Sequence, residues 1–412
     1  MVPELDLILN NCCFIVYSNM KYFIENLFFT KCLKQLSVVC LLGILSYPHL
    51  LMAQTSKEII YVGTYSQNNS KGIYVLEFDR ENLTTQIIQT IHDKESPTFL
   101  ALHPNKKFLY AAYREGKNEQ DEAGTVIAYS IAPETGKLTK INSVSSVGAS
   151  PCHISVDPTG NVVFLSHYKG GNLSTFKVLK NGGLSEATSF IQHTGKSVHP
   201  NQTTAHMHAM IPSTDGKWVY ASDLGIDQIL KYKVDIKKGT VEENPVIFQT
   251  SPGSGPRHFV FHPSLPYAYS LEELSNTVSI YSLDKSNGDL SPIGRINMLN
   301  DKLHSDYNAG ADIHFSKDGL WLYASNRGQD NLVVYQVDPE SGWLKTQGHI
   351  PSGGVHPRNF KVDEIGDFVF VANMETDNIA IFNVDNKTGM LKATDKNIEI
   401  PRPVFIEQLF IK

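Results

Sequence analysis

The sequence contains little cysteine, and most of it lies in the first forty residues. Four of the five cysteines precede residue 41, and only Cys152 lies farther along the 412-residue chain. A framework of disulfides therefore cannot hold the body of the protein together. A basic excess is also missing, because 36 Lys and Arg residues stand against 42 Asp and Glu residues, a formal net charge of −6. This balance argues against nucleic acid or an anionic membrane surface as a partner.

The N-terminal region has no apolar run long enough to span a membrane. Residues 36–45 form an apolar run of ten that follows two lysines and precedes a small residue at Ala53, whereas a spanning helix needs about 20 apolar residues. This order of features is typical of a secretory signal. We therefore expect residues 1–53 to be an export leader, and residues 54–412 to form one periplasmic domain with no stable membrane span. A leader retained as a membrane anchor is the alternative, and a start at Met20 would shorten the leader.

Glycine, proline and tyrosine are plentiful, and the aromatic residues repeat along the chain. An apolar triplet ending in Tyr or Phe recurs at spacings of 49, 54, 56, 49, 54 and 47 residues. The seven aromatic residues are Tyr61, Tyr110, Phe164, Tyr220, Tyr269, Tyr323 and Phe370. Turn-forming clusters such as His103-Pro104-Asn105 and Asp318-Gly319 precede the triplets, and further short apolar runs lie on both sides. Each unit thus predicts four antiparallel strands, and the period indicates a repeat architecture.

Seven such units, without a long amphipathic helix, predict an all-β fold, a seven-bladed β-propeller of four-stranded antiparallel blades. The first unit, from about Ile59, lacks a run that matches an innermost strand. The segment Pro403-Val404-Phe405-Ile406 resembles Pro97-Thr98-Phe99-Leu100, which begins an inner strand. We therefore expect the C-terminal strand to complete the first blade and close the ring, which removes open sheet edges.

The hairpin lengths indicate where charged side chains gather. In six consecutive units the aromatic residue of the second strand lies twelve residues after the start of the first strand. Because the first strand of a propeller blade lines the axis and the second returns antiparallel, positions twelve before and four after the aromatic residue share one rim. The ionisable residues at these positions include His208, Arg257, Arg358, Arg114, Glu273 and Arg327. Four arginines and one glutamate leave a positive surplus, which favours an anionic ligand.

These residues lie in stretches that resemble the seven-bladed lactonase family, which includes the propeller-type 6-phosphogluconolactonases and the fungal carboxymuconate lactonizing enzymes. The resemblance extends from about Lys57 to the C-terminus. The matching stretches are Tyr61-Val62-Gly63-Thr64-Tyr65, Ala205-His206-Met207-His208, Ala221-Ser222-Asp223-Leu224-Gly225, Gly255-Pro256-Arg257-His258, Glu273-Leu274-Ser275-Asn276-Thr277 and Ser325-Asn326-Arg327-Gly328. The resemblance implies a catalytic group made of His208, Glu273, Arg257 and Arg327. Ala205 departs from the family, in which proline often occupies this position.

Hydrolysis of a lactone requires a base for the attacking water and stabilisation of the developing oxyanion. We expect Glu273 or His208 to be the base, and Arg257 and Arg327 to divide between the oxyanion and a substrate carboxylate or phosphate. The expected substrate-binding residues are His206, Arg114 and Arg358. A purely structural ion pair between Arg257 and Glu273 is the alternative.

Two neighbouring pairs of residues bear on other chemistries. His206 and His208 are two apart, so on a strand they would point to one face and could ligate a metal. No third ligand is evident in the local sequence, so we expect neither a metal nor another cofactor. Cys152 has a rim position, but His153 should point the opposite way, which favours a lining role for Cys152 over a nucleophile. The remaining histidines near first strands, His258, His314 and His356, are expected to be satisfied or exposed.

Three functions follow from these observations. We favour hydrolysis of a small anionic sugar lactone, as in the 6-phosphogluconolactonases. Cycloisomerisation of a carboxylated muconate is the second, and it needs a proton donated to carbon instead of attack by water. An exported, non-catalytic binding scaffold is the third, because this fold hosts many unrelated functions. Export also leaves the particular lactone open, because 6-phosphogluconolactone is a cytosolic metabolite.

Overall fold

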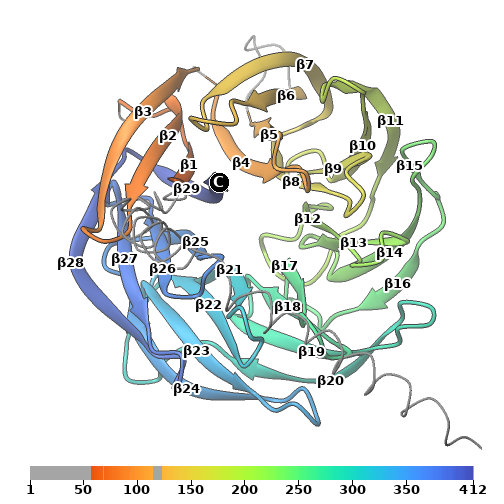
Figure 1. The fold of residues 1–412 in the computed structure, drawn as a ribbon. Helices are drawn as coiled ribbons and strands as arrows, with labels where there is room; N and C mark the ends of the chain where they lie inside the picture. Colours follow the sequence, from red (N-terminus) through yellow and green to blue (C-terminus); the bar gives the residue numbers. More distant parts are fainter. Residues whose placement is uncertain (1–56, 68, 94, 115–122, 412) are drawn as a thin grey trace, which may run out of the picture. The chain divides into compact units, whose positions relative to one another are not determined.

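The computed structural model describes residues 57–67, 69–93, 95–114 and 123–411. The expected leader, residues 1–53, lies outside them. The described part contains 29 strands and no α-helix, and the strands form seven antiparallel sheets. Figure 1 shows these sheets as blades around a common axis. The predicted seven-bladed β-propeller is confirmed.

The strands of each blade follow one another from the axis outward. Blade 1 consists of β29 (Pro403–Ile411), β1 (Lys57–Thr64), β2 (Gly72–Asp79) and β3 (Thr84–His92). Blade 2 consists of β4 (Pro97–Leu102), β5 (Phe108–Tyr113), β6 (Ala123–Ile131) and β7 (Leu138–Ala149). Blade 3 consists of β8 (Pro151–Val156), β9 (Val162–His167), β10 (Asn172–Val178) and β11 (Leu184–Gln192). Blade 4 consists of β12 (Met207–Pro212), β13 (Trp218–Asp223), β14 (Gln228–Asp235) and an outer strand split into β15 (Thr240–Val241) and β16 (Val246–Gln249).

The last three blades have the same plan. Blade 5 consists of β17 (Pro256–Phe261), β18 (Tyr267–Glu272), β19 (Thr277–Leu283) and β20 (Leu290–Asn297). Blade 6 consists of β21 (Ala309–Phe315), β22 (Trp321–Arg327), β23 (Asn331–Val337) and β24 (Leu344–Pro351). Blade 7 consists of β25 (Pro357–Val362), β26 (Phe368–Asn373), β27 (Asn378–Val384) and β28 (Leu391–Glu399).

The C-terminal strand closes the ring as expected. β29 pairs antiparallel with β1, from Lys57 opposite Ile411 to Thr64 opposite Pro403. It is the innermost strand of the first blade, next to the axis in Figure 1. The two ends of the described chain therefore share one sheet, and β29 covers the edge of β1 that would otherwise be open.

The hydrophobic core is divided among the seven interfaces between adjacent blades. One cluster packs Tyr61 of blade 1 against Leu109 of blade 2, and another packs Tyr269 of blade 5 against Leu322 of blade 6. Corresponding clusters lie at the other five interfaces. Because each blade is covered on both faces, its central strands read as continuous apolar triplets and not as alternating patterns.

A tyrosine hydroxyl ties most neighbouring blades together. In five blades the aromatic residue that ends the triplet donates a hydrogen bond to a glycine carbonyl in a turn of the next blade. The pairs are Tyr61 and Gly136 (2.8 Å), Tyr110 and Gly182 (3.1 Å), Tyr220 and Gly288 (2.5 Å), Tyr269 and Gly342 (2.8 Å), and Tyr323 and Gly389 (2.9 Å). All five glycines have φ between 68° and 84°, the left-handed region that glycine adopts without a steric cost.

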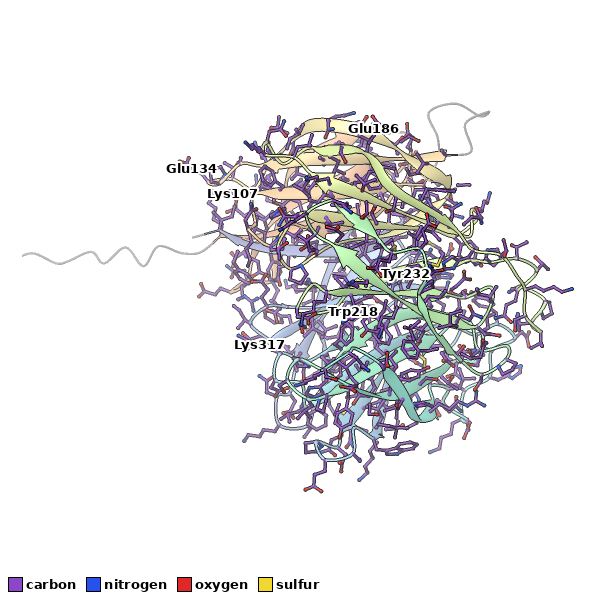
Figure 2. All side chains as sticks on the ribbon, turned by 90° about the vertical axis from the view of Figure 1, so that its right-hand side faces the viewer. Lys107, Glu134, Glu186, Trp218, Tyr232 and Lys317 are labelled. Atoms are coloured by element: carbon purple, nitrogen blue, oxygen red, sulfur yellow. The ribbon has the colours of Figure 1, made fainter. Side chains whose placement is uncertain are left out.

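The two blades with phenylalanine at this position are linked differently. Beside Phe164, Thr175 donates to the carbonyl of Gly239 in the next blade at 2.9 Å. In the blade with Phe370, Asp363 forms an ion pair with Arg80 of blade 1, which lies over the ring of Phe368. These links lie toward the rim that carries the turns between first and second strands. Figure 2 shows Lys107 and Lys317, from two such turns, on that side of the ring, together with Glu134 from the turn between β6 and β7.

No helix in the described part of the chain is long and apolar enough to cross a membrane.

Candidate functional site

Each inner strand carries a one-residue bulge at the same rim. The register between the first and second strands shifts by one residue in blades 2 to 7, and between β29 and β1 in blade 1. The extra residues are Val404, Thr98, Cys152, His208, Arg257, Ala311 and Arg358. A bulge re-aims side chains, and here Arg257 and its successor His258 both contact residues of neighbouring blades around the axis. The bulges therefore define the chemistry of this rim.

Four of the predicted residues meet at this rim, and we call them the rim cluster: His208, Arg257, Glu273 and Arg327. Arg257 Nη1 donates to Glu273 Oε2 at 2.7 Å and also contacts His208 Nε2. Arg327 Nη2 approaches the same carboxylate oxygen at 3.1 Å. The four side chains come from blades 4, 5 and 6, so the packing of three consecutive blades brings together residues more than a hundred positions apart.

Backbone carbonyls hold both arginines in place. Arg257 Nε donates to the carbonyl of Ala311 at 2.6 Å, and Arg327 Nη2 donates to that of Gly310 at 2.8 Å. Only 4% of each arginine is exposed, whereas 14% of the Glu273 side chain is exposed. Glu273 Oε1 accepts no hydrogen bond from the described residues. This oxygen is therefore the free acceptor of the rim cluster.

The charges of the rim cluster shift one another's titration. Burial raises the pKa of Glu273, but neighbouring arginines, led by Arg327 and Arg257, outweigh burial and lower it to about 2. Burial, with help from other arginines, lowers the pKa of Arg257 to about 10 against the opposing effect of Glu273. Burial and then Arg257 lower the pKa of His208 well below its usual range. At neutral pH the cluster holds an ionised carboxylate, a neutral imidazole and two guanidinium ions.

A second pair of arginines lies around the ring of Tyr65. Arg114 Nη1 donates to the Tyr65 hydroxyl at 2.6 Å, and the guanidinium carbons of Arg114 and Arg358 lie 5.5 Å and 5.3 Å from the centre of the Tyr65 ring. Neither arginine forms an ion pair with a described carboxylate. Burial raises the pKa of Tyr65, but Arg358, Arg114 and Arg257 outweigh burial and lower it. This pair adds to the one positive charge that Glu273 leaves unneutralised in the rim cluster.

His206 is close to the rim cluster but does not share a strand face with His208. It precedes β12, its ring stacks on Tyr168 with centroids 4.5 Å apart, and its Nδ1 contacts the Tyr168 carbonyl at 2.8 Å. The expectation that both histidines lie on a strand is wrong for His206, since β12 begins at Met207, although both rings contact the ring of Tyr168. Within the described ranges no three His, Cys, Asp or Glu side chains are grouped to hold a metal ion.

Cys152 and His153 correct a second expectation. The bulge at Cys152 turns both side chains toward the axis, so His153 does not point the opposite way. Its ring lies 4.4 Å from Phe99 and 5.8 Å from His258, both on other inner strands. Burial raises the pKa of Cys152 to about 11, so the thiol is protonated at neutral pH and a lining role fits it.

Three residues of this region were missed from the sequence. Tyr65 and Tyr168 lie four positions after an aromatic triplet residue, as Glu273 does, so the spacing rule that located Glu273 also locates them once uncharged polar side chains are included. Asp312 follows a bulge position and lies in the next layer along the axis, where it binds His258. The position of Asp312 could not be predicted from the sequence, because it depends on the bulge in β21.

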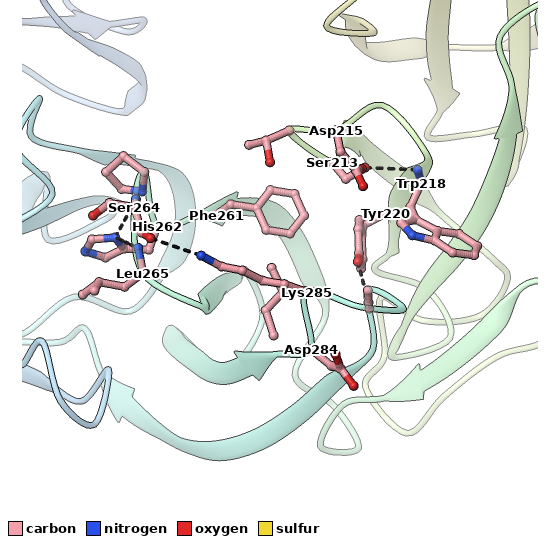
Figure 3. A pocket seen from close by; sticks show the side chains of 14 residues that line it. Ser213, Asp215, Trp218, Tyr220, Phe261, His262, Ser264, Leu265, Asp284 and Lys285 are labelled. Carbon is pink, nitrogen blue, oxygen red and sulfur yellow. Dashed lines mark hydrogen bonds between the residues drawn. The ribbon is translucent and has the colours of Figure 1, made fainter.

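A separate pocket lies between blades 4 and 5, at the C-terminal ends of β12 and β17, which are the ends away from the rim cluster (Figure 3). Its volume is about 250 Å³. Its polar groups are used within the local turns, since His262 Nδ1 accepts the backbone N–H groups of Ser264 and Leu265, and Lys285 Nζ donates to the carbonyl of Ser264. No surplus of one charge converges on this pocket, so we assign the chemistry to the rim cluster.

Comparison with known proteins identifies the class. Residues 59–408 match the family model described as lactonase, 7-bladed β-propeller. A 6-phosphogluconolactonase of Formosa agariphila is 35% identical over 316 residues, which cover 75% of this chain and 88% of the relative. A 6-phosphogluconolactonase of Bacillus subtilis is 34% identical over 314 residues, which cover 76% of this chain and 87% of the relative. The solved periplasmic gluconolactonase PpgL of Pseudomonas aeruginosa is 27% identical with a TM-score of 0.79, over 87% of this chain and all of that one.

The chain therefore belongs to the seven-bladed β-propeller lactonase family. This confirms the family resemblance and the expected enzyme class, a lactone hydrolase.

Proposed function

We propose that this lactonase hydrolyses a small anionic sugar lactone of the 6-phosphogluconolactone type. The observation that carries the proposal is the charge of the rim, where Arg114, Arg257, Arg327 and Arg358 surround the one carboxylate of Glu273. Partly buried charges of one sign need a counter-ion or a ligand. Guanidinium groups bind carboxylates and phosphates through paired hydrogen bonds. The curated relatives named above carry the matching activity in their names.

The geometry divides the work between two groups of residues. Arg114 and Arg358, beside Tyr65, hold the phosphate or carboxylate of the substrate. Arg257 and Arg327 face the lactone carbonyl and stabilise its oxyanion.

Glu273 is the base, because Oε1 accepts no hydrogen bond from the described residues, whereas Oε2 is held by Arg257 and Arg327. His208 Nε2, the other candidate, is occupied by Arg257. Oε1 takes a proton from water, the water oxygen bonds to the carbonyl carbon, the ring C–O bond breaks, and the ring oxygen receives a proton to give the open acid. A pKa of about 2 makes Glu273 a weak base in the free enzyme. When an anionic substrate accepts hydrogen bonds from Arg257 and Arg327, these arginines interact less with Glu273, and the pKa of Glu273 rises. His206 lines the approach beside Tyr168.

Export of the protein is part of the proposal. It is supported by the apolar run at residues 36–45 and by similarity to a solved lactonase described as periplasmic. We propose that residues 1–53 direct export and that residues 54–412 act in the periplasm. A periplasmic enzyme would meet lactones from outside the cytosol, so an unphosphorylated lactone that carries a carboxylate and an uncharged lactone both belong in any substrate panel.

Proton release in a pH-stat, measured on the purified protein with phosphorylated and unphosphorylated sugar lactones, tests the function. We expect turnover that Arg257→Ala and Glu273→Gln each lower by about a hundredfold or more. Glu58→Gln is the matched control, because Glu58 forms a buried ion pair with Arg80 at 2.9 Å on the other rim; it should retain turnover. A well-folded protein that hydrolyses no lactone would leave the scaffold function, and conversion of a carboxylated muconate would establish the lactonizing one.

A further inference from the structure

A buried carboxylate lies below the rim cluster in the next layer along the axis. Asp312 follows the bulge of β21 and is 2% exposed. Its Oδ1 contacts His258 Nδ1 at 2.7 Å, and its Oδ2 contacts His314 Nε2 at 2.9 Å and Asn359 Nδ2. The backbone N–H of Ile313 donates to Oδ1 at 3.0 Å. Asp312 is thus fully used as an acceptor.

The partners of Asp312 determine the hydrogen positions on His258. Burial raises the pKa of Asp312, but His314 and His258 outweigh burial and lower it, so the carboxylate is ionised and only accepts. His258 Nδ1 therefore carries the hydrogen. Burial lowers the pKa of His258 despite Asp312, so the ring is neutral and its Nε2 is an acceptor.

The same reasoning determines the hydrogen positions on His208. Arg257 has only donors, so the His208 Nε2 that it contacts must accept. Because His208 is neutral, its hydrogen lies on Nδ1. His208 therefore presents a donor where His258 presents an acceptor.

These two atoms are the unsatisfied ones. His208 Nδ1 and His258 Nε2 are both buried without a hydrogen-bond partner among the described residues. The two rings lie 5.4 Å apart, centre to centre, at 65°. No direct bond joins the two nitrogens, so one water between them would complete the link. A buried donor and a buried acceptor left unpaired would each be costly.

We propose that a one-directional hydrogen-bond chain runs from Arg257 through His208 and His258 to Asp312, and that His258 and Asp312 are positioning residues for Arg257. The chain keeps His208 in the tautomer whose Nε2 accepts from Arg257. Because His208 Nε2 accepts a hydrogen bond from Arg257, the guanidinium group is held in the orientation that faces Glu273 and the substrate. The catalytic consequence rests on the proposed function, whereas the tautomers do not.

Protonation of His208 would break the chain, because Nε2–H would then face the donors of Arg257. The titratable and charged groups that face His208 are Arg257 and His258 of β17, Arg358 of β25, His153 of β8 and Tyr168. The arginines and the neighbouring histidines oppose a positive charge on His208. The chain is therefore intact throughout the neutral range.

Nitrogen-15 NMR of the full chain labelled at histidine tests the chain without any substrate. The spectra separate protonated from unprotonated ring nitrogens, and His208→Asn and His258→Asn assign the signals. We expect both rings to carry hydrogen on Nδ1 and not on Nε2 at pH 7.5. Hydrogen on Nε2 of either ring would overturn the proposal, even if the protein hydrolyses lactones.

Turnover then tests the positioning role. His258→Phe keeps an aromatic ring but removes the acceptor, so we expect the His208 signals to move and kcat/KM to fall about tenfold. His314→Gln is the control, because His314 binds the same Asp312 but has no contact with His208; it should leave both readouts unchanged. If His258→Phe and His314→Gln had equal effects, Asp312 would have only a structural role, and the proposal would be overturned. Absence of turnover in the unmodified protein would count against the proposed function alone.

Discussion

Glu272 and Glu273 are consecutive in the chain, yet their surroundings shift their pKa values in opposite directions. Glu272 ends β18, and its carboxylate accepts hydrogen bonds from Ser279 (2.7 Å) and Thr277 (3.1 Å). Burial raises its pKa to about 7, with these hydrogen bonds opposing. Glu273 lies one position farther, between two arginines that lower its pKa to about 2 against the effect of burial. One position along the chain thus separates a carboxyl that resists ionisation from one that is ionised throughout the neutral range.

The raised pKa of Glu272 predicts a loss of stability with rising pH. Between about pH 4.5 and pH 7 the unfolded chain releases this proton and the folded protein does not, so the free energy of unfolding falls across that window. The shift corresponds to about 3 kcal/mol. We expect Glu272→Gln, which cannot ionise, to be more stable than the natural protein at pH 8 and to lose that advantage at pH 5. Urea denaturation at a series of pH values measures the difference.

Glu273→Gln should show the opposite dependence and is the matched comparison. A depressed pKa contributes stability above pH 4.5 that is lost as the pH falls toward 2. The variant should therefore be less stable than the natural protein at pH 7, with the gap closing in acid. If the free energy of unfolding depended on pH in the same way in Glu272→Gln and Glu273→Gln, the opposite pKa shifts of the two carboxyls would be contradicted.

Glu273→Gln should also separate turnover from ligand binding. Loss of a general base lowers kcat by about 10² to 10⁴. The same change frees Arg257 and Arg327 from their carboxylate, so we expect the variant to bind the anionic product at least as tightly as the natural protein. Isothermal titration with the open acid measures binding, and circular dichroism checks the fold. Retained turnover would show that the Arg257–Glu273 pair is purely structural.

Tyr269→Phe should weaken the junction between blades 5 and 6 without affecting turnover. The change removes the donor to the Gly342 carbonyl, 2.8 Å away, on the rim opposite the rim cluster. A lost buried hydrogen bond costs about 1–2 kcal/mol. Denaturant titration and a turnover assay on the same sample check both parts. Phe164 and Phe370 occupy the equivalent position in other blades, so the phenylalanine ring should fit without a steric clash. An unchanged denaturation midpoint would contradict the prediction that the hydrogen bond contributes to stability.

The fold could be predicted from the sequence because its strongest signal is local. The apolar triplets, such as the one ending at Tyr323, are buried between two blades, so they recur without interruption. The match between Pro403-Val404-Phe405 and Pro97-Thr98-Phe99 predicted ring closure. The split outer strand of blade 4 could not be predicted, since edge strands bury little and vary freely.

The rim residues could be predicted, but their neighbours could not. Equal hairpin lengths placed Arg257, Glu273 and Arg327 at one rim whether or not the strands contain bulges. The direction of the following side chain depends on the bulge, which adds a residue to one strand and leaves no mark in the hairpin length. The orientation of His153 was therefore predicted wrongly, and Asp312 was missed.

Arg358→Gln should change the preference between phosphorylated and unphosphorylated lactones. The Arg358 guanidinium lies 5.3 Å from the Tyr65 ring centre and has no carboxylate partner in the described chain, so its charge is available to a substrate anion. We expect KM for a phosphorylated lactone to rise at least tenfold, with kcat within a few-fold, and KM for the uncharged lactone to change little. Steady-state kinetics on matched lactones measures the split.

Arg402→Gln is the comparison for that experiment, because Arg402 Nη1 is already neutralised by Glu375 at 2.5 Å. Loss of this paired charge should leave the preference unchanged. Raising the ionic strength should weaken binding of the phosphorylated lactone in the natural protein more than in Arg358→Gln, since salt screens the charge that the variant lacks. An equal rise in KM for charged and uncharged lactones would instead show that Arg358 shapes the site sterically. Binding of the substrate anion would then be assigned to Arg114 alone.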